Sequence, residues 1–195
     1  MTERPRAFHR RLAVATAAIL ILTFSTALAW QVPTGSFLVL GKLEHRALLS
    51  VAELRALPIP TQTITVTFLA GPNPQQHTYV GPLLYDLMNH FGPKFDPDVK
   101  NDFLRFHVSA TGADEYQAIV SWGEFDPNFG NTPVLLATSE DGRPLDNDGP
   151  RLVVPGDIRG GRYVTNVVAL RLERALEFPP CPKHWPWWLW LRGDC

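Results

Sequence analysis

The amino-acid sequence predicts a single α+β domain whose core is dominated by β-strands. The chain of 195 residues is 45% hydrophobic and has a formal net charge of -1, which suits one globular domain and argues against disorder. About seven short segments are apolar or alternate in polarity, as strands do, and only two segments have helical spacing. No internal repeat or low-complexity linker divides the chain.

The expected elements follow one another closely along the chain. A first helix begins at Ser50, because Ser50 and Glu53 have the spacing of a capping box, and it ends before Pro58. A second helix ends at Gly92, since apolar residues at helical spacing precede this glycine. Asp141-Gly142 marks a tight turn between two strands. In chain order the sequence predicts strands over 34–43 and 61–68, a polar turn over 71–76, the second helix over 83–91, and strands over 103–109, 116–122, 134–138, 151–154 and 164–172.

The N-terminus has the pattern of an export signal. Four arginines within residues 1–11 precede an uncharged, mostly apolar stretch over residues 12–29. This stretch ends in a small-x-small pattern, so we expect a signal peptide over residues 1–29, cleavage after Ala29 and a periplasmic or secreted protein. The alternative is a membrane anchor formed by residues 12–29, and Arg10-Arg11 leaves the twin-arginine export route open. A domain over residues 30–175 and a tail over 176–195 follow.

Charge and composition exclude several classes of function. Lys plus Arg total 18 and Asp plus Glu total 19, whereas a protein that neutralises nucleic-acid phosphates has a basic excess. Two cysteines cannot build a disulfide-rich scaffold or a four-cysteine metal site. The sequence has no nucleophile-elbow, HExxH or P-loop motif, and no two of its six histidines have metal-ligand spacing on one element. We therefore expect no nucleic-acid partner and no metal site.

A segment rich in glycine and arginine follows the strand predicted over residues 151–154. Glycines let backbone amides approach an oxyanion, and an arginine guanidinium can bind a phosphate through two hydrogen bonds. The segment therefore predicts a site for a small anionic ligand. A bent connection with surface arginines is the alternative, and the spacing alone does not decide between them. The residues of this candidate site are Gly156, Arg159, Gly160, Gly161 and Arg162.

Four motifs of this sequence resemble motifs of the oxidoreductase molybdopterin-binding domain family, and they occur in the same order as in that family. The fold of this family is the catalytic core of sulfite oxidase. The motifs are VGPLLYDL at residues 80–87, DEY at 114–116, LLA and DGRPL within 135–145, and RLVVPG at 151–156. The resemblance implies a mostly-β, sulfite-oxidase-like α+β fold and a molybdopterin-dependent oxidoreductase. It also implies that the pterin and its phosphate lie on the glycine- and arginine-rich segment, with His107 and Tyr116 lining the pocket. Without the resemblance, the sequence favours His107 and Tyr116 as hydrogen-bonded structural residues, with Tyr116 in the core, and a role in a pocket is the alternative.

Two departures from the family pattern bear on activity. Redox-active members ligate molybdenum with a cysteine in the loop after the strand that corresponds to residues 61–68, and here residues 69–77 contain no cysteine. Because a soft thiolate is the ligand selected for this role, its absence argues against sulfite-type redox chemistry. Thr165 and Asn166 stand where the family has lysine and tryptophan. The alternative to an enzyme is a non-catalytic module that keeps the fold, needs no cofactor, and binds an anion or a protein partner.

The tail over residues 176–195 differs in composition from the domain. It contains four of the six tryptophans, within residues 185–190, and both cysteines of the chain. In an oxidising compartment we expect a disulfide between Cys181 and Cys195, which for a loop of about 15 residues is worth roughly 3 kcal/mol. Exposed tryptophans would form a large apolar patch, so we expect them to pack on the domain or on a protein partner, with membrane contact as the alternative.

Overall fold

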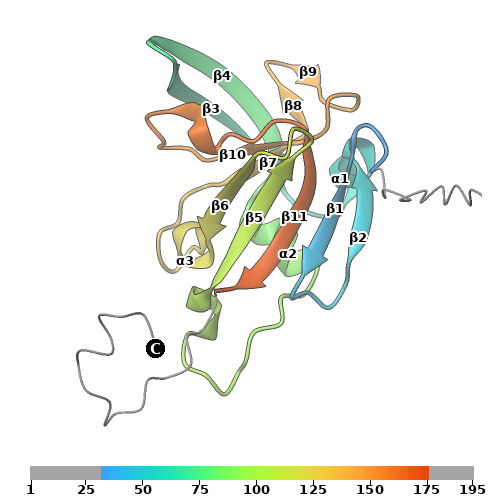
Figure 1. The fold of residues 1–195 in the computed structure, drawn as a ribbon, viewed down its shortest axis with the longest axis vertical. Helices are drawn as coiled ribbons and strands as arrows, with labels where there is room; N and C mark the ends of the chain where they lie inside the picture. The colour runs from blue at the N-terminus through green and yellow to red at the C-terminus, as the bar shows by residue number, and fades with distance from the viewer. Residues whose placement is uncertain (1–31, 176–195) are drawn as a thin grey trace, which may run out of the picture. The chain divides into compact units, whose positions relative to one another are not determined.

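The computed structural model describes residues 32–175, which form an α+β domain dominated by strands, as the sequence predicts (Figure 1). The largest sheet has the strand order β2-β1-β11-β5-β6, in which only β1 and β11 run parallel. Its members are β1 (Ser36–Gly41), β2 (Ala47–Ser50), β5 (Phe106–Gly112), β6 (Gln117–Ser121) and β11 (Val167–Arg174).

A second sheet is built around a long hairpin. Its strands, in spatial order, are β3 (Thr61–Ala70), β4 (Asn73–Pro82), β8 (Ser139–Glu140) and β9 (Arg143–Pro144). β3 and β4 pair along their whole length, which leaves only Gly71 and Pro72 for the turn. The polar turn predicted over residues 71–76 is therefore too long, and residues 69–77 are mostly hairpin strand and not a loop. The first half of β4 is exposed on both faces, so it lacks the alternation that identifies a strand.

The remaining pair of strands, β7 (Leu135–Ala137) and β10 (Arg151–Val153), is antiparallel and fully buried except for Arg151. β10 leads into the glycine- and arginine-rich segment. Leu83 bridges to Leu135, so β7 also borders the start of the second helix.

The helices are short. α1 (Val51–Ala56) begins with the predicted capping box, in which the Glu53 amide donates to Ser50 Oγ at 3.2 Å and the Ser50 amide donates to the Glu53 carboxylate at 2.7 Å. α2 (Leu84–His90) lies behind the five-stranded sheet in Figure 1 and ends before Gly92, whose φ of +68° is left-handed. Both predicted helices are thus confirmed.

Two segments predicted as strand begin or end differently. Asp102–Arg105 form a 3-10 turn, so β5 starts at Phe106 and not at residue 103. Trp122 is the first residue of the one-turn helix α3 (Trp122–Phe125), whereas the sequence predicts it as the last residue of a strand. Its indole is 2% exposed and its Nε1 donates to Asp126 at 2.9 Å, so burial of this ring with its hydrogen bond decides the local structure.

One continuous core lies beneath both sheets. β1 and β11 place Phe37, Val39, Leu170 and Leu172 at zero exposure. Trp122 joins the same core through ring contacts, among them an edge-to-face contact with Phe95 whose centroids are 4.7 Å apart. Because these buried side chains pack closely against one another, the sheet is a rigid support for the loops at its ends.

The predictions for the two ends of the chain concern residues outside the described range. They are the signal peptide over residues 1–29 and the tryptophan-rich tail over 176–195, which includes the Cys181–Cys195 disulfide. These stay predictions. Within residues 32–175, no helix has both the length and the apolar character needed to span a membrane.

Candidate functional site

The predicted anion-binding segment forms a loop, here called the Gly-Arg loop (residues 155–163), that packs on the end of β3. The amide of Leu69 donates a hydrogen bond to the carbonyl of Ile158 at 2.9 Å, and Leu69 also forms an isolated parallel bridge with Arg159. Arg159 is exposed, and its guanidinium approaches the Gly71 carbonyl at 3.5 Å. The loop therefore connects β10 to the tip of the β3–β4 hairpin.

Arg162 is held by two carboxylates of the protein itself. Its Nε and Nη2 donate to Asp157 at 2.9 and 2.6 Å, and its Nη1 donates to Glu124 at 2.9 Å. The hydrogen bonds to Asp157, and then those to Glu124, raise the pKa of the guanidinium far above its usual value. One positive charge faces two negative charges, so this group carries a local charge of about -1. Such a group does not attract a phosphate.

Gly160 is a glycine because the Phe68 ring lies against it. A Cβ on Gly160 would come within 2.8 Å of that ring. Phe68 in turn packs edge-to-face on Tyr163, with ring centroids 4.6 Å apart. The two other glycines of the Gly-Arg loop, Gly156 (at a φ of +96°) and Gly161, have open space where a side chain would stand. Packing of β3 on the loop therefore accounts for the central glycine.

Tyr116 differs from the buried core residue that the sequence favours. Its side chain is 50% exposed, and its hydroxyl donates to the Gly161 carbonyl at 2.5 Å. This bond ties the start of β6 to the Gly-Arg loop. The ring is exposed because the tight turn that precedes β6 places Tyr116 at the edge of the five-stranded sheet, beyond the reach of the core.

His107 is not brought to the Gly-Arg loop. It lies on β5 opposite Ser121, five residues along the strand from Gly112, whose amide donates to the Tyr116 carbonyl. At a rise of about 3.3 Å per residue, His107 and Tyr116 stand about 17 Å apart along the sheet. His107 is half-buried beside Glu173, with Nε2 and Oε2 3.8 Å apart. The two residues do not line a common pocket.

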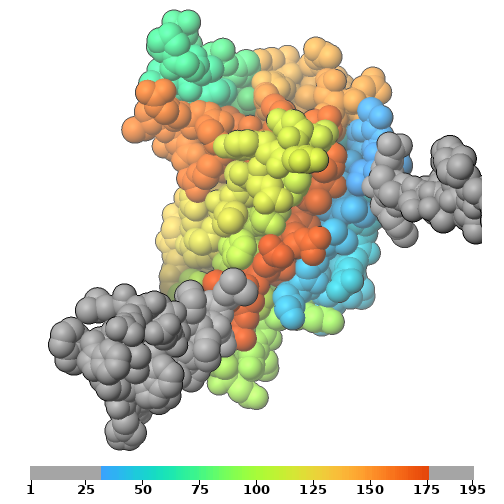
Figure 2. All heavy atoms as spheres, in the orientation of Figure 1, coloured from blue at the N-terminus to red at the C-terminus, as the bar shows by residue number. Residues whose placement is uncertain are grey.

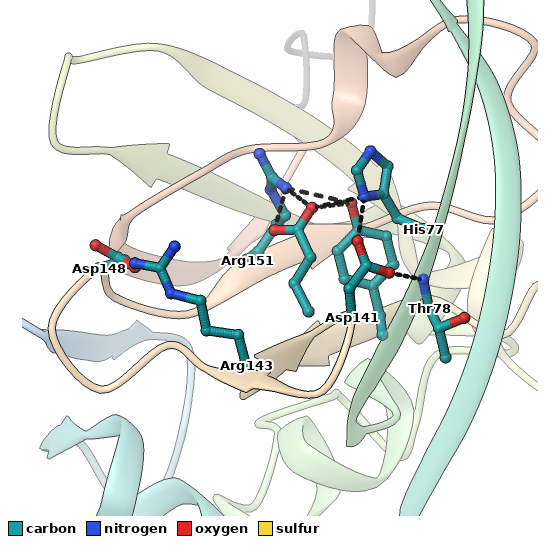
Figure 3. Close-up of polar contacts among 8 residues, drawn as sticks. His77, Thr78, Asp141, Arg143, Asp148 and Arg151 are labelled. Atoms are coloured by element: carbon teal, nitrogen blue, oxygen red, sulfur yellow. Dashed lines mark hydrogen bonds and ion pairs between the residues drawn. The ribbon is translucent and has the colours of Figure 1, made fainter.

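A second group of polar residues, which sequence patterns did not single out, lies where β4 meets β8. We call it the His77 cluster (His77, Tyr79, Glu140, Asp141 and Arg151); Figure 3 shows the side chains of His77, Asp141 and Arg151 converging. His77 Nδ1 lies 2.7 Å from Asp141 Oδ2 and 3.3 Å from Glu140 Oε1. Arg151 donates from Nη1 to both Glu140 oxygens at 2.5 Å, and Tyr79 donates its hydroxyl to Glu140 at 3.0 Å.

Two pKa values in the His77 cluster are shifted, one by hydrogen bonds and one by burial. The Thr78 amide donates to Asp141 Oδ1 at 2.8 Å, and this bond, followed by the His77 imidazole, lowers the pKa of the Asp141 carboxyl. Burial raises the pKa of the Tyr79 phenol well above its usual value, although Arg151 opposes the shift. Tyr79 is therefore a neutral donor at physiological pH and is not a general base.

The ligand atoms of His77, Glu140 and Asp141 lie within 4.8 Å of one another, so their geometry allows a bound cation. Arg151 already forms an ion pair with Glu140, and the Thr78 amide donates a hydrogen bond to Asp141 Oδ1. A divalent ion would compete with both. The cluster is satisfied by its own hydrogen bonds, and it fastens the turn after β8 to the hairpin strand β4.

A polar pocket of about 360 Å³ opens beside the His77 cluster, and a second hollow of about 330 Å³ adjoins it across Glu140 and Asp148. Arg151 forms one wall of the larger pocket, and Thr165 and Asn166 form another. The pocket therefore offers a guanidinium, carboxylates, amides and a hydroxyl. This set can hydrogen-bond a small polar molecule, but it contains no nucleophile paired with a base.

Sequence reasoning missed the His77 cluster because its members are remote in the chain. Arg151 appeared only as the first letter of a strand motif, and His77 and Glu140 had no special spacing. The pairing of β4 with β8 brings His77 to Glu140, and the pairing of β7 with β10 brings Arg151 to them. No local pattern carries that information.

Comparison with solved structures agrees with this architecture. The chain is similar to the sulfane dehydrogenase SoxCD from Paracoccus pantotrophus, with a TM-score of 0.53 and 23% sequence identity, over 71% of this chain and 38% of that chain. It thus spans well under half of the matched chain's length. No protein-family model and no curated protein matches the sequence. The structural likeness confirms that this chain has a mostly-β, sulfite-oxidase-like α+β fold.

Proposed function

We propose that this chain is an exported binding module with a sulfite-oxidase-like fold, and that it does not carry out molybdenum redox chemistry. The double pairing of Arg162 with Asp157 and Glu124 is the observation that carries the proposal. A pterin phosphate at this position would have to displace two carboxylates that already match the guanidinium. It would also have to lie beside their negative charges.

Two further features do not fit a molybdopterin. Phe68 occupies the space over Gly160 where backbone amides would have to approach a phosphate. A two-residue turn, Gly71-Pro72, replaces the loop in which the family supplies its thiolate, and both cysteines of the chain lie in the tail. The described residues contain no cysteine, whereas molybdenum in this family takes a soft thiolate ligand from the protein.

Ligand binding is assigned to the polar pocket beside the His77 cluster. Glu140 and Asp148 oppose Arg151 in its walls, so the pocket suits a small polar molecule with both donors and acceptors better than a phosphate. Native mass spectrometry of the exported protein tests the assignment. We expect a co-purified small molecule in the wild type that is lost in Thr165→Trp, which fills the pocket, and retained in Thr165→Ser. An identical spectrum for all three proteins contradicts it.

A second candidate is a protein that still binds molybdopterin. The Tyr163 hydroxyl favours it, because this oxygen is buried and has no hydrogen-bond partner within residues 32–175. Burial also raises the pKa of Tyr163, so its hydroxyl is a donor without an acceptor at the end of the Gly-Arg loop, among the described residues. If the cofactor were bound, Tyr163, Arg159 and Arg162 would hold it, and it would supply two-electron oxidation and reduction at the metal.

Metal and pterin analysis distinguishes the two candidates. The protein is expressed with its own N-terminus in a host that makes molybdopterin and is purified from the periplasm. We expect molybdenum and pterin far below one per chain in the wild type. The matched variant Glu124→Gln removes one carboxylate from Arg162 and leaves its shape, so it should gain pterin only under the second candidate. Molybdenum near one per chain in the wild type overturns the proposal.

A further inference from the structure

The outer strand of the second sheet, β3, has a free edge along most of its length. Carbonyls of Thr78 and Val80 accept bonds from Asp141 and Thr138, so the even-numbered residues of β4 face β8. Hydrogen-bonding direction alternates along an antiparallel ladder, and β4 therefore bonds the even-numbered residues of β3. The odd-numbered residues of β3 direct their N–H and C=O groups outward. We call the first four of these the edge threonines (Thr61, Thr63, Thr65 and Thr67).

Leu69, the next residue of the outward series, confirms this direction. Its amide bonds the Ile158 carbonyl of the Gly-Arg loop, outside the hairpin. The edge threonines have no such neighbour: no backbone group within residues 32–175 bonds their outward N–H or C=O groups, and all four are exposed. Pro60, which has no N–H, precedes the free stretch, and Ile158 closes its other end. The free stretch thus runs from Thr61 to Thr67.

Among the other edge strands of the two sheets, β6 (five residues) is half as long as β3, and β9 and β2 carry protection that β3 lacks. β9 has two residues, Arg143 and Pro144, which combine a charge with a residue that cannot donate to a ladder. β2 has four residues and follows Arg46. β3 has ten residues and contains neither a charge nor a proline. An edge this long without protection is a template for another strand.

We propose that β3 pairs antiparallel with β3 of a second copy of this chain, around a two-fold axis at Ile64. Ile64 is the midpoint of the free stretch. In this register Thr61 faces Thr67 of the other copy and Thr63 faces Thr65, so each outward N–H and C=O meets its complement. The same patch serves both copies, as a two-fold interface requires.

The side chains of β3 are complementary to themselves in this register. Directly opposed residues of an antiparallel pair share a face, so edge threonines meet edge threonines on one face and Ile64 meets Ile64 on the other. Thr–Thr pairs and β-branched pairs both stabilise a sheet, and no like charges oppose each other. Figures 1 and 2 show the tip of the hairpin, drawn in teal and green, projecting from the rest of the domain.

Pairing along one strand buries less surface than a standard stable interface, which exceeds about 1,200 Å². The dimer is therefore expected to dissociate on dilution. Sedimentation velocity of the exported protein across a dilution series should show a shift from twice the monomer mass to the monomer mass. A wild type that is monomeric throughout the series overturns the proposal.

Two substitutions at Thr63 make the test specific. Thr63→Pro removes an outward N–H that the domain itself does not use, so the hairpin should remain folded by circular dichroism while dimerisation is lost. Thr63→Val keeps the N–H and the branched shape, and it should dimerise like the wild type. Thr63 is chosen because its side chain, unlike those of Thr65 and Thr67, makes no hydrogen bond with residues 32–175. Dimerisation of Thr63→Pro at wild-type strength contradicts the pairing.

Amide hydrogen exchange in the wild type provides a readout that needs no variant. The edge-threonine amides should exchange slowly at high protein concentration and rapidly after dilution, because only the second copy protects them. Exchange that is fast at every concentration overturns the proposal. Slow exchange in a monomer also overturns it, since the edge would then be paired with another segment of the same chain or with a bound peptide.

Discussion

Replacing Arg162 with methionine should destabilise the domain by about 2 kcal/mol. A hydrogen bond to a charged group contributes about 1.5–3 kcal/mol when buried, and an exposed ion pair contributes less than about 1 kcal/mol. The side chains of Arg162, Glu124 and Asp157 are 35%, 28% and 20% exposed, so each pair lies between these limits and near the lower one. Two pairs at about 1 kcal/mol each lower Tm by about 4–8 °C in a domain of this size.

Thermal and urea unfolding at neutral pH measure this loss, with Arg159→Met as the matched control. Arg159 has the same side chain on the same loop but makes only the 3.5 Å contact with Gly71, so its loss should change the free energy of unfolding by less than about 0.5 kcal/mol. Adding Glu124→Gln and Asp157→Asn to Arg162→Met should restore much of the stability, because the unpaired carboxylates are then removed. Equal losses for Arg162→Met and Arg159→Met refute the pairing. A rise in wild-type Tm on adding inorganic phosphate, absent in Arg162→Met, refutes the inference that the loop is closed to anions.

Four further predictions test the fold and the ends of the chain. Asp141 has a lowered pKa, so its bonds stabilise the domain above its ordinary pKa of 3.8 and are lost as pH falls through the lower folded value; Asp141→Asn should make the urea midpoint less dependent on pH in that acidic range. Gly81→Ala forces a Cβ to within 2.1 Å of a β7 carbonyl and should cost about 1–3 kcal/mol in urea unfolding, whereas Gly161→Ala, with open space, should cost less than about 0.5 kcal/mol. Intact mass of the exported protein should correspond to a chain that begins after Ala29, and an uncleaved mass indicates a membrane anchor instead. Alkylation without reductant should leave Cys181 and Cys195 unmodified, and two alkylated thiols contradict the disulfide.

Local chemistry explains which elements the sequence predicts correctly. The Ser50–Glu53 capping box and the helix that ends at Gly92 depend on residues within a few positions of each other, and both form as expected. The length of β4 was missed because its first residues are polar on both faces. Such a strand is held by its hairpin partner, and no hydrophobic pattern reports that pairing.

The contacts that the site residues make cannot be predicted from their neighbours in the sequence. The sequence identifies Arg162 as a candidate anion-binding residue. Its charge is matched in part by Glu124, which lies 38 positions earlier in the chain. No sequence pattern singles out His77 and Arg151, because they converge on Glu140 only through the pairing of β4 with β8 and of β7 with β10. Charge and residue type therefore identify candidates, whereas the fold decides whether a charge is available to a ligand or is already matched by the protein.

The glycine and arginine residues of the Gly-Arg loop fit either a phosphate site or a set of structural contacts. Glycines beside arginines predict a phosphate site because both features are required there. In this fold each feature has a different cause: Gly160 admits the Phe68 ring, Arg162 is matched by two carboxylates, and Arg159 lies over the tip of the hairpin. The contacts of Gly160 and Arg159 fasten the loop to the β3–β4 hairpin, and the contact of Arg162 with Glu124 fastens it to α3. The free stretch of β3 lies along the same edge through which Leu69 bonds the loop. Gly160 and Arg159, which would hold an anion in a cofactor enzyme, thus brace the hairpin through whose free edge, we propose, two copies of this chain associate.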